Sequence, residues 1–256
     1  VQILSSNLVS NGDFSQEGVQ EVSNGSFSQE GANIITPIAN SDFSSDTGYW
    51  TKETGVTISG GLMNMSSTPN NQGFYKGGII EVGKNYKVEV TISGYSEGLL
   101  DSSNSNSFSF PQSNGTYVVY FTGANPSLSF AANGTTTLSI DNVSCVEVGQ
   151  DWSLGTGWSI GEGKAERLVA TSSSDLVQAS VFPNLTSTFR ISFDIEASAG
   201  SVRARLGQTN LNYVGQGTHT FYAIPSGNDQ LKFQADSSFI GSITNISVKE
   251  VGQNWT

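Results

Sequence analysis

Short segments in which apolar and polar residues alternate dominate this chain. The clearest is Tyr86–Ser93, where every second residue is apolar and the residues between them are polar. Such alternation predicts a half-buried antiparallel strand, and Ile79–Val82 and Phe189–Ala197 are predicted strands as well. Turn residues recur about every ten positions, and no useful length of chain has the 3.6-residue period of a capped helix. The pattern therefore predicts an all-β chain.

Most of the chain is an internal duplication. The segment LSIDNVSCVEVGQDW at Leu138–Trp152 returns as SITNISVKEVGQNW at Ser242–Trp255, with corresponding residues 103 positions apart. The strand region Gly115–Ala132 likewise matches Gly217–Ala235. Repeats of this length are whole domains rather than solenoid units of about 20–50 residues. We therefore expect two β-sandwich modules, at residues 38–148 and 149–251, and we expect 252–256 to begin a further one.

A shorter repeat occupies the start of the chain. The sequence SNGDFSQEGVQEV at 10–22 returns as SNGSFSQEGANII at 23–35, and a weaker third copy contains Phe43. A unit this small cannot bury its own apolar residues, so it must pack on neighbouring units or on other chains. Two interpretations of residues 1–37 stay open. One is a loosely packed linker made of copies of a module's first strand. The other is a β stalk in which several chains, three by preference, share a core containing Phe14 and Phe27.

The composition indicates a polar but weakly charged surface. Hydrophobic residues make up 36% of the chain, enough for a packed core, whereas charged residues make up only 13%, against a usual value of about 25%. The net charge of −11 argues against binding to nucleic acid or to anionic membranes. No apolar stretch is long enough to insert into a membrane. Such a surface favours a location outside the cell or on a virion.

No residue pattern in the chain indicates catalysis or a cofactor. The single cysteine, Cys145, excludes an intrachain disulfide and is typical of a small buried apolar residue. His219 is the only histidine, and no G-x-S-x-G motif accompanies it. A glycosidase needs two carboxylates that face each other, and no acidic motif predicts such a pair. We therefore expect a protein that is not an enzyme.

The motifs resemble those of jelly-roll carbohydrate-binding modules. The segments NSDF, GYW, GKNYKVEV, GTYVVYF and IDNVSCVEV follow one another in the order found in that family. The tandem copies resemble most closely those in bacteriophage tail fibres and other virion appendages, and the resemblance covers nearly all of residues 38–255. It implies two tandem jelly-roll β-sandwiches, in which Trp50 and Trp158 pack into the core.

The resemblance also implies a structural calcium ion near the first and last strands. Asp141 would supply one oxygen ligand in the first module. Thr244 stands at this position in the second module, so the expectation applies to the first module alone. The alternative is that Asp141 is a turn residue whose side chain hydrogen-bonds its own backbone.

Tyrosines are the best candidates for contact with sugars, because binding modules of this kind stack aromatic rings on sugar faces. Alternation places Tyr120 and Tyr222 on the outer side of corresponding strands, at the same position in both copies. Tyr213 and Tyr95, in loops or at strand ends, are the next candidates. The alternative is that Tyr120 and Tyr222 cover a second sheet or form a subunit contact.

These observations lead to one main hypothesis of function. The chain is expected to be a non-catalytic segment of a virion fibre or appendage, a spacer whose repeated modules bind host-surface glycans with useful avidity. One alternative is a pair of accessory carbohydrate-binding modules of a secreted bacterial enzyme or adhesin. Another is a subunit of an extracellular filament that binds no ligand.

Overall fold

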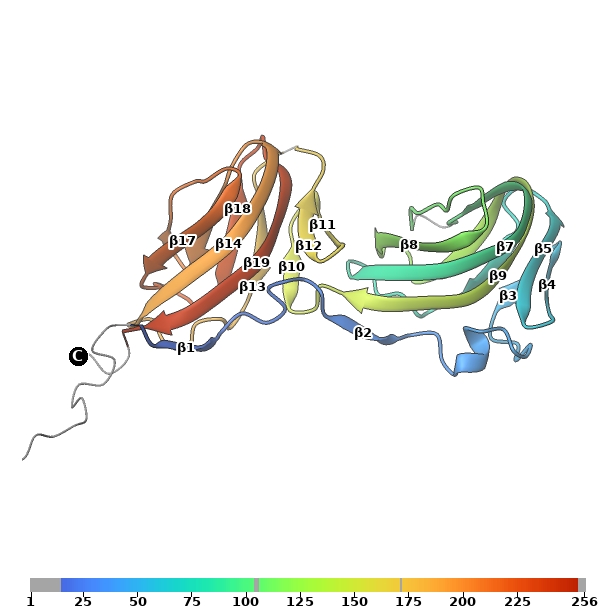
Figure 1. Cartoon of the computed structure of the whole chain (residues 1–256), viewed down its shortest axis with the longest axis horizontal. Helices are drawn as coiled ribbons and strands as arrows, with labels where there is room; N and C mark the ends of the chain where they lie inside the picture. The colour runs from blue at the N-terminus through green and yellow to red at the C-terminus, as the bar shows by residue number, and fades with distance from the viewer. Residues whose placement is uncertain (1–14, 104–105, 171, 253–256) are drawn as a thin grey trace, which may run out of the picture. The chain divides into compact units, whose positions relative to one another are not determined.

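A computed structural model describes residues 15–103, 106–170 and 172–252. The fold is all-β, as predicted, with one 3-10 helix, η1 (Ile38–Asn40), among the described residues. The chain forms two compact units (Figure 1). Module 1 is residues 29–150, and module 2 combines the described residues of 1–28 with those of 151–256. None of the described segments is a helix long and apolar enough to cross a membrane.

Module 1 is built around two long antiparallel strands, β7 and β9. Its strands are β2 (Glu30–Asn33), β3 (Thr51–Lys52), β4 (Val56–Ser59), β5 (Leu62–Thr68), β6 (Gly73–Lys76), β7 (Asn85–Asp101), β8 (Gly115–Thr122) and β9 (Leu128–Val148). The first part of β9 pairs with β6 and its later part pairs with β5. Register shifts between Ser93 and Leu99 interrupt the pairing of β7 with β9. Such bulges bend strands, and Figure 1 shows both strands curving.

The core of module 1 lies between the two layers that these bent strands connect. Trp50 and Phe74 have ring centroids 5.3 Å apart, and Phe74 stacks on Phe130 at 4.8 Å. Trp50 is buried, as the resemblance implied. The predicted strand at Ile79–Val82 is wrong, because this segment is a loop in which the amides of Ile79 and Ile80 both donate to the carbonyl of Pro126.

Module 2 is a sandwich of two separate sheets. Its strands are β1 (Glu17–Gln20), β10 (Trp152–Leu154), β11 (Trp158–Gly161), β12 (Lys164–Arg167), β13 (Ser174–Gln178), β14 (Thr188–Ala199), β15 (Val202–Leu206), β16 (Thr209–Asn210), β17 (Gly217–Ala223), β18 (Leu231–Ala235) and β19 (Ile240–Val251). The β19 sheet has the order β11-β12-β19-β14-β17, with β1 also paired to β19. The β18 sheet has the order β10-β13-β18-β15-β16. Phe193 of β14 meets Phe233 of β18 edge to face between the sheets, at 4.9 Å, and Trp158 is buried as expected.

The short N-terminal repeats supply the first strand of each module. In module 2, β1 pairs with β19, and the side-chain carbonyl of Gln20 accepts the amide of Val248 at 2.9 Å. In module 1, β2 pairs with β9, and Asn33 accepts the amide of Cys145 in the same way at 3.1 Å. Gln20 and Asn33 are 13 residues apart, and Cys145 and Val248 are 103 apart. Both repeats therefore dock in equivalent ways.

Aromatic residues then anchor each docked segment. Phe27 packs on Trp152 at 5.3 Å, and the indole NH of Trp152 donates to the carbonyl of Asn24. Phe43 packs on Trp50 at 6.4 Å, and the indole of Trp50 donates to the carbonyl of Asn40. Trp152 in module 2 is therefore the structural counterpart of Trp50 in module 1, because each packs on the phenylalanine of its docked segment and donates to a backbone carbonyl of that segment.

The boundaries expected from the sequence differ from those of the structure. Residues 1–37 are not one separate segment, because the first strand of module 2 precedes module 1 and the rest of module 2 follows it. β1 pairs with β19 and β2 pairs with β9, which are the places that copies of a module's first strand would take. A core shared between chains is wrong for Phe27, which is only 2% exposed within its own module. Phe14 and the segment 253–256, predicted to belong to a further module, lie outside the described residues.

Candidate functional site

The outer side of the β18 sheet in module 2 carries an unusual set of polar side chains. On the inner side, Leu176, Ala204 and Phe233 are fully buried in the core. Because neighbouring residues of a strand point to opposite sides, the alternate residues of these strands face outward. We call this set the polar face; it consists of Asp175, Val177, Arg203, Arg205, Lys232 and Gln234.

Strand register arranges the polar face in two rows. Gln234 of β18 pairs with Asp175 of β13 on one side and with Arg203 of β15 on the other. The next row is Val177, Lys232 and Arg205, in the same strand order. Adjacent strands lie about 4.8 Å apart, so each three-strand row spans about 10 Å, enough for a ligand of disaccharide size.

A hydrogen-bond network holds one side of the face in place. The guanidinium of Arg203 donates from Nε and Nη2 to the side-chain oxygen of Gln234, at 2.9 and 2.6 Å. The hydroxyl of Tyr213 donates to the same oxygen at 3.4 Å. The ring of Tyr213 also lies over the Arg203 guanidinium, 4.9 Å from it, and Tyr213 remains 43% exposed. An exposed aromatic ring is thus fixed beside charged and amide groups.

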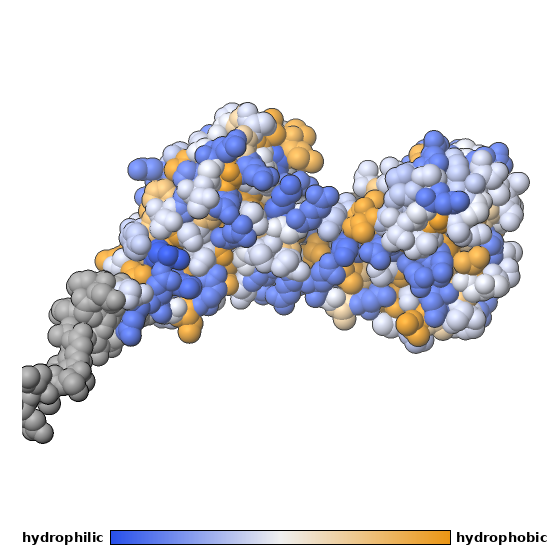
Figure 2. Space-filling model, viewed as in Figure 1, coloured by the Kyte–Doolittle hydropathy of each residue, from blue (hydrophilic) through white to orange (hydrophobic). Residues whose placement is uncertain are grey.

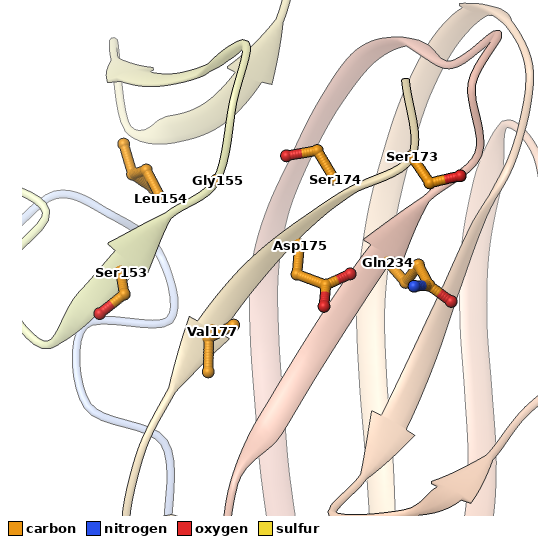
Figure 3. A pocket seen from close by; sticks show the side chains of 8 residues that line it. All are labelled: Ser153, Leu154, Gly155, Ser173, Ser174, Asp175, Val177 and Gln234. Carbon is orange, nitrogen blue, oxygen red and sulfur yellow. The ribbon is translucent and has the colours of Figure 1, made fainter.

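A depression of about 400 Å³ lies over the paired strands β10 and β13, at the other side of the face (Figure 3). Ser153 and Leu154 of β10 line one wall, and Asp175, Val177 and Gln234 line the other. Figure 3 shows the carboxylate of Asp175 beside Gln234 of the neighbouring strand.

Three buried polar atoms in this region have no hydrogen-bond partner among the described residues. They are Oδ1 of Asp175, Oγ of Ser174 and Nε of Arg205. Ser174 and Asp175 both line the depression, and Arg205 belongs to the second row. A buried polar group without a partner costs about 1–3 kcal/mol, and such groups in native proteins call for an explanation. Ser174 lies on the core side of β13, whereas Asp175 and Arg205 belong to the polar face, where a ligand that both donates and accepts hydrogen bonds would satisfy them.

Module 1 lacks this arrangement at the corresponding positions. Asp101 pairs with Ala131 there, as Arg203 pairs with Gln234 in module 2. Gly73, on the other side of Ala131, stands where module 2 has Asp175. The counterpart of Lys232 is Ser129, which is buried and hydrogen-bonded to Ser103. The polar face is therefore specific to module 2.

The structure places one of the four candidate tyrosines, Tyr213, at the polar face. Tyr222 is 63% exposed, but it lies on β17, in the other sheet of module 2, opposite Arg190. Tyr120 lies at the equivalent place in module 1, opposite Lys87 on β7. Each of these two tyrosines is therefore on the sheet that contains the closing strand, away from the polar residues described above.

The remaining candidate residues show no ligand site. Tyr95 packs against the core of module 1, and its hydroxyl donates to the carbonyl of Gly98 at 3.0 Å. Asp141 lies on β9 next to Asn142, which has the positive φ of 51° that is typical of a bend. Within residues 15–103, 106–170 and 172–252, no three His, Cys, Asp or Glu residues are grouped to hold a metal. Calcium binding by Asp141 stays a prediction.

A second depression of about 490 Å³ lies on the β19 sheet of module 2. Glu166 and Glu196 line it, and both pair with Ser242, from opposite sides of β19. Lys164 lies 4.0 Å from Glu196 and partly neutralises it. The described residues that line this depression include no exposed aromatic ring, whereas the polar face has Tyr213, so the polar face is the better candidate for ligand binding.

The face of the molecule that Figure 2 shows agrees with the composition. Figure 2 shows hydrophilic and weakly polar residues over most of the visible face, with hydrophobic residues in small scattered groups. Exposed apolar side chains in module 2 include Leu168 and Val169, which are 66% and 63% exposed. They lie at one end of β12, apart from the polar face.

Comparison with solved structures gives 35 matching chains, two of which are described here. Neither a family model nor a curated protein matches the chain. The N-terminal CBM22-1–CBM22-2 tandem domain of Paenibacillus barcinonensis Xyn10C is 11% identical, with a TM-score of 0.28; the match covers 92% of this chain and 99% of that one. A fucolectin from striped bass (Morone saxatilis) serum is 8% identical, with a TM-score of 0.25; the match covers 93% and 99%. Likenesses at this level do not assign a ligand.

Proposed function

We propose that module 2 binds a carbohydrate on the polar face and that the protein is not an enzyme. The observation that carries the proposal is the pair of unpartnered polar atoms on the polar face, Oδ1 of Asp175 and Nε of Arg205, on the same sheet side as the fixed ring of Tyr213. Sugars present both hydroxyl groups and apolar ring faces, so they need this combination of groups from a protein.

Each group on the face has a role in such binding. The Asp175 carboxylate accepts hydrogen bonds from sugar hydroxyls, and the guanidinium of Arg205 donates to hydroxyl or ring oxygens. The ring of Tyr213 covers an apolar sugar face, and its contacts with Arg203 and Gln234 fix its position before the ligand arrives. Such pre-organisation lowers the entropic cost of binding.

A non-catalytic role is supported by the carboxylates at the site. Asp175 is the one carboxylate among the described residues that line the depression. Hydrolysis of a glycosidic bond normally uses two carboxyl groups, about 5–9.5 Å apart, on opposite sides of the scissile bond. The polar face can therefore orient a sugar but lacks the usual pair that would cleave it.

A glycan microarray probed with the intact protein tests the proposal. Wild type should bind a restricted set of glycans, and Tyr213→Ala should weaken binding at least tenfold, or about 1.4 kcal/mol. Tyr213→Phe keeps the ring and should retain most of the affinity, while Tyr222→Ala removes an exposed ring from the opposite sheet and should have no effect. If binding survives Tyr213→Ala but is lost in Tyr222→Ala, the binding site lies on the β19 sheet and the proposal is refuted.

We further propose that the protein acts in a virion fibre or another extracellular appendage, where it recognises a cell-surface glycan. The support is the order of the tandem motifs and the weakly charged surface. Immunolabelling of purified particles with an antibody to module 2 tests the virion location, and absence of label would favour the accessory-module or filament alternatives. Self-association as a trimer is part of the same proposal.

A further inference from the structure

The polar face is cationic within an acidic protein. Three of its six residues, Arg203, Arg205 and Lys232, are positively charged, and Asp175 is its one acid. The whole chain has only 11 Lys and Arg residues against 22 Asp and Glu. A cluster of three cations on one side of one sheet therefore stands out from a surface that is otherwise negative or neutral.

These three cations also form no ion pair with the residues that the structure describes. Six other Lys and Arg residues form the salt bridges of the described chain. Arg203 contacts an amide oxygen and an aromatic ring, neither of which neutralises its charge. Arg205 has a buried Nε without a partner among the described residues. Charges that are left unpaired on a structured face are available to an incoming anion.

The positions of the cations suit an anion held against a sugar ring. Arg205 and Lys232 are direct cross-strand neighbours, and two like charges in that position repel each other. A carboxylate or sulfate placed between them would relieve the repulsion and accept charge-assisted hydrogen bonds, which are about twice as strong as neutral ones. Tyr213 lies one row away, beside Arg203. One sugar residue can therefore stack on the ring while its own or a neighbouring acidic group reaches the cation pair.

From these contacts we infer that the ligand of module 2 is an acidic saccharide, with a uronate or sialate carboxylate or a sulfate ester bound between Arg205 and Lys232. This inference rests on the proposed function, because it names the ligand class of the same site. Module 1 does not share the preference, since Asp101 and Ser129 replace Arg203 and Lys232.

Affinity electrophoresis of the intact protein with paired polymers tests the inference. Polygalacturonate is compared with its carboxyl-reduced neutral form, and heparin with desulfated heparin, so that each pair differs in charge but not in sugar backbone. At least one polyanion should retard the wild type, and its uncharged or less charged partner should bind at least tenfold more weakly. Lys232→Gln and Arg205→Gln should each lower affinity at least fivefold. Lys84→Gln makes the same change in net charge in module 1 and should have no effect.

The outcomes separate failure of the inference from failure of the proposed function. Retardation by polygalacturonate but not by its carboxyl-reduced form identifies a carboxylate ligand, and retardation by heparin but not by desulfated heparin identifies a sulfate ligand. Equal binding to both members of a pair, with loss in Tyr213→Ala, overturns the acidic ligand but leaves carbohydrate binding standing. If neither polyanion retards the protein but neutral glycans bind on the microarray, the acidic ligand is likewise overturned and carbohydrate binding stands. No binding in either assay overturns both. Equal weakening by Lys84→Gln and Lys232→Gln would reveal only diffuse charge attraction and overturn the inference.

Discussion

The substitution Phe27→Ala tests whether the N-terminal segment is a structural part of module 2. Phe27 is 125 residues away in sequence from Trp152 (152 − 27), yet it is 2% exposed and packs on Trp152 at 5.3 Å. The same segment forms a salt bridge between Glu17 and Arg190 and places Gly25 so close to the carbonyl of Ile246 that a Cβ would collide with it. We therefore expect Phe27→Ala to destabilise module 2 and to leave module 1 unchanged.

The expected magnitude follows from the burial of the ring. Replacing a buried Phe by Ala costs about 3–5 kcal/mol, from lost apolar transfer and from the cavity left behind. A domain has roughly 5–15 kcal/mol of stability in total, so the loss is large. At about 1.4 kcal/mol for each factor of ten, amides that exchange through opening of the whole module should exchange at least about 100-fold faster.

Hydrogen exchange measured by mass spectrometry on the intact protein gives the exchange rates of amides in each module separately. Phe43→Ala is the matched control, because Phe43 is 1% exposed and packs on Trp50 in the equivalent place in module 1. Phe27→Ala should accelerate exchange in residues 15–28 and 151–252 alone, and Phe43→Ala in residues 29–150 alone. Unchanged exchange in 151–252 with Phe27→Ala would refute the docked first strand. A change in molecular mass in place of a change in exchange would support a core shared between chains.

Four further predictions concern the Cys145 thiol, the Asp236 carboxyl group, calcium binding by Asp141 and the oligomeric state of the chain. Burial raises the pKa of Cys145 to about 12, so a thiol reagent at pH 8 should label it only after unfolding, and rapid labelling of the folded protein would contradict its burial. Burial alone would raise the pKa of Asp236, but hydrogen bonds from Ser201 and Ser238 outweigh it and lower the pKa. Ionised Asp236 therefore stabilises the fold at pH values above its unfolded pKa of about 3.9, and this stabilisation is lost as the pH falls through the lower folded pKa. Between pH 6 and pH 2, the melting temperature of Asp236→Asn should therefore fall less than that of the wild type. Parallel melting curves for the two proteins would refute this. If Asp141 binds calcium, millimolar Ca²⁺ should raise the melting temperature of module 1 in wild type and not in Asp141→Asn, and identical melting in Ca²⁺ and EDTA would count against the site. Light scattering of the intact chain should give the mass of a trimer if the N-terminal repeats self-associate, and a monomer would end that proposal.

Much of the fold could be predicted because it depends on local alternation and on the duplication. Tyr86–Ser93 lies within β7, where Val88 and Val90 are fully buried, as the pattern indicated. The nested arrangement of the modules could not be predicted, because the short repeats contain no signal for which module each one joins. β1 pairs with β19, which is far away in sequence, because this pairing buries Val22 and Phe27 and allows the side chain of Gln20 to form hydrogen bonds.

The candidate site shows where comparison of the two copies was misleading. The search for residues retained in both modules selected Tyr120 and Tyr222, which lie on equivalent strands away from the polar face. The polar face instead lies where the modules differ, with Gln234 in place of Ala131. A signal was present in the sequence, since VRARL at 202–206 holds two of only 11 cations at alternate positions of a strand. Whether these two arginines lie beside Lys232 and Gln234 depends on the register of β15 with β18, which the sequence alone does not supply.

The central claim is that carbohydrate binds to the outer side of the β18 sheet, and chemical-shift mapping tests it most directly. The intact, isotopically labelled protein is titrated with the oligosaccharide that gives the strongest microarray signal. The account predicts that the perturbed amides cluster in β13, β15 and β18 and around Tyr213. Perturbations centred on β8 or β17, around Tyr120 or Tyr222, or the absence of any saturable perturbation, would contradict it.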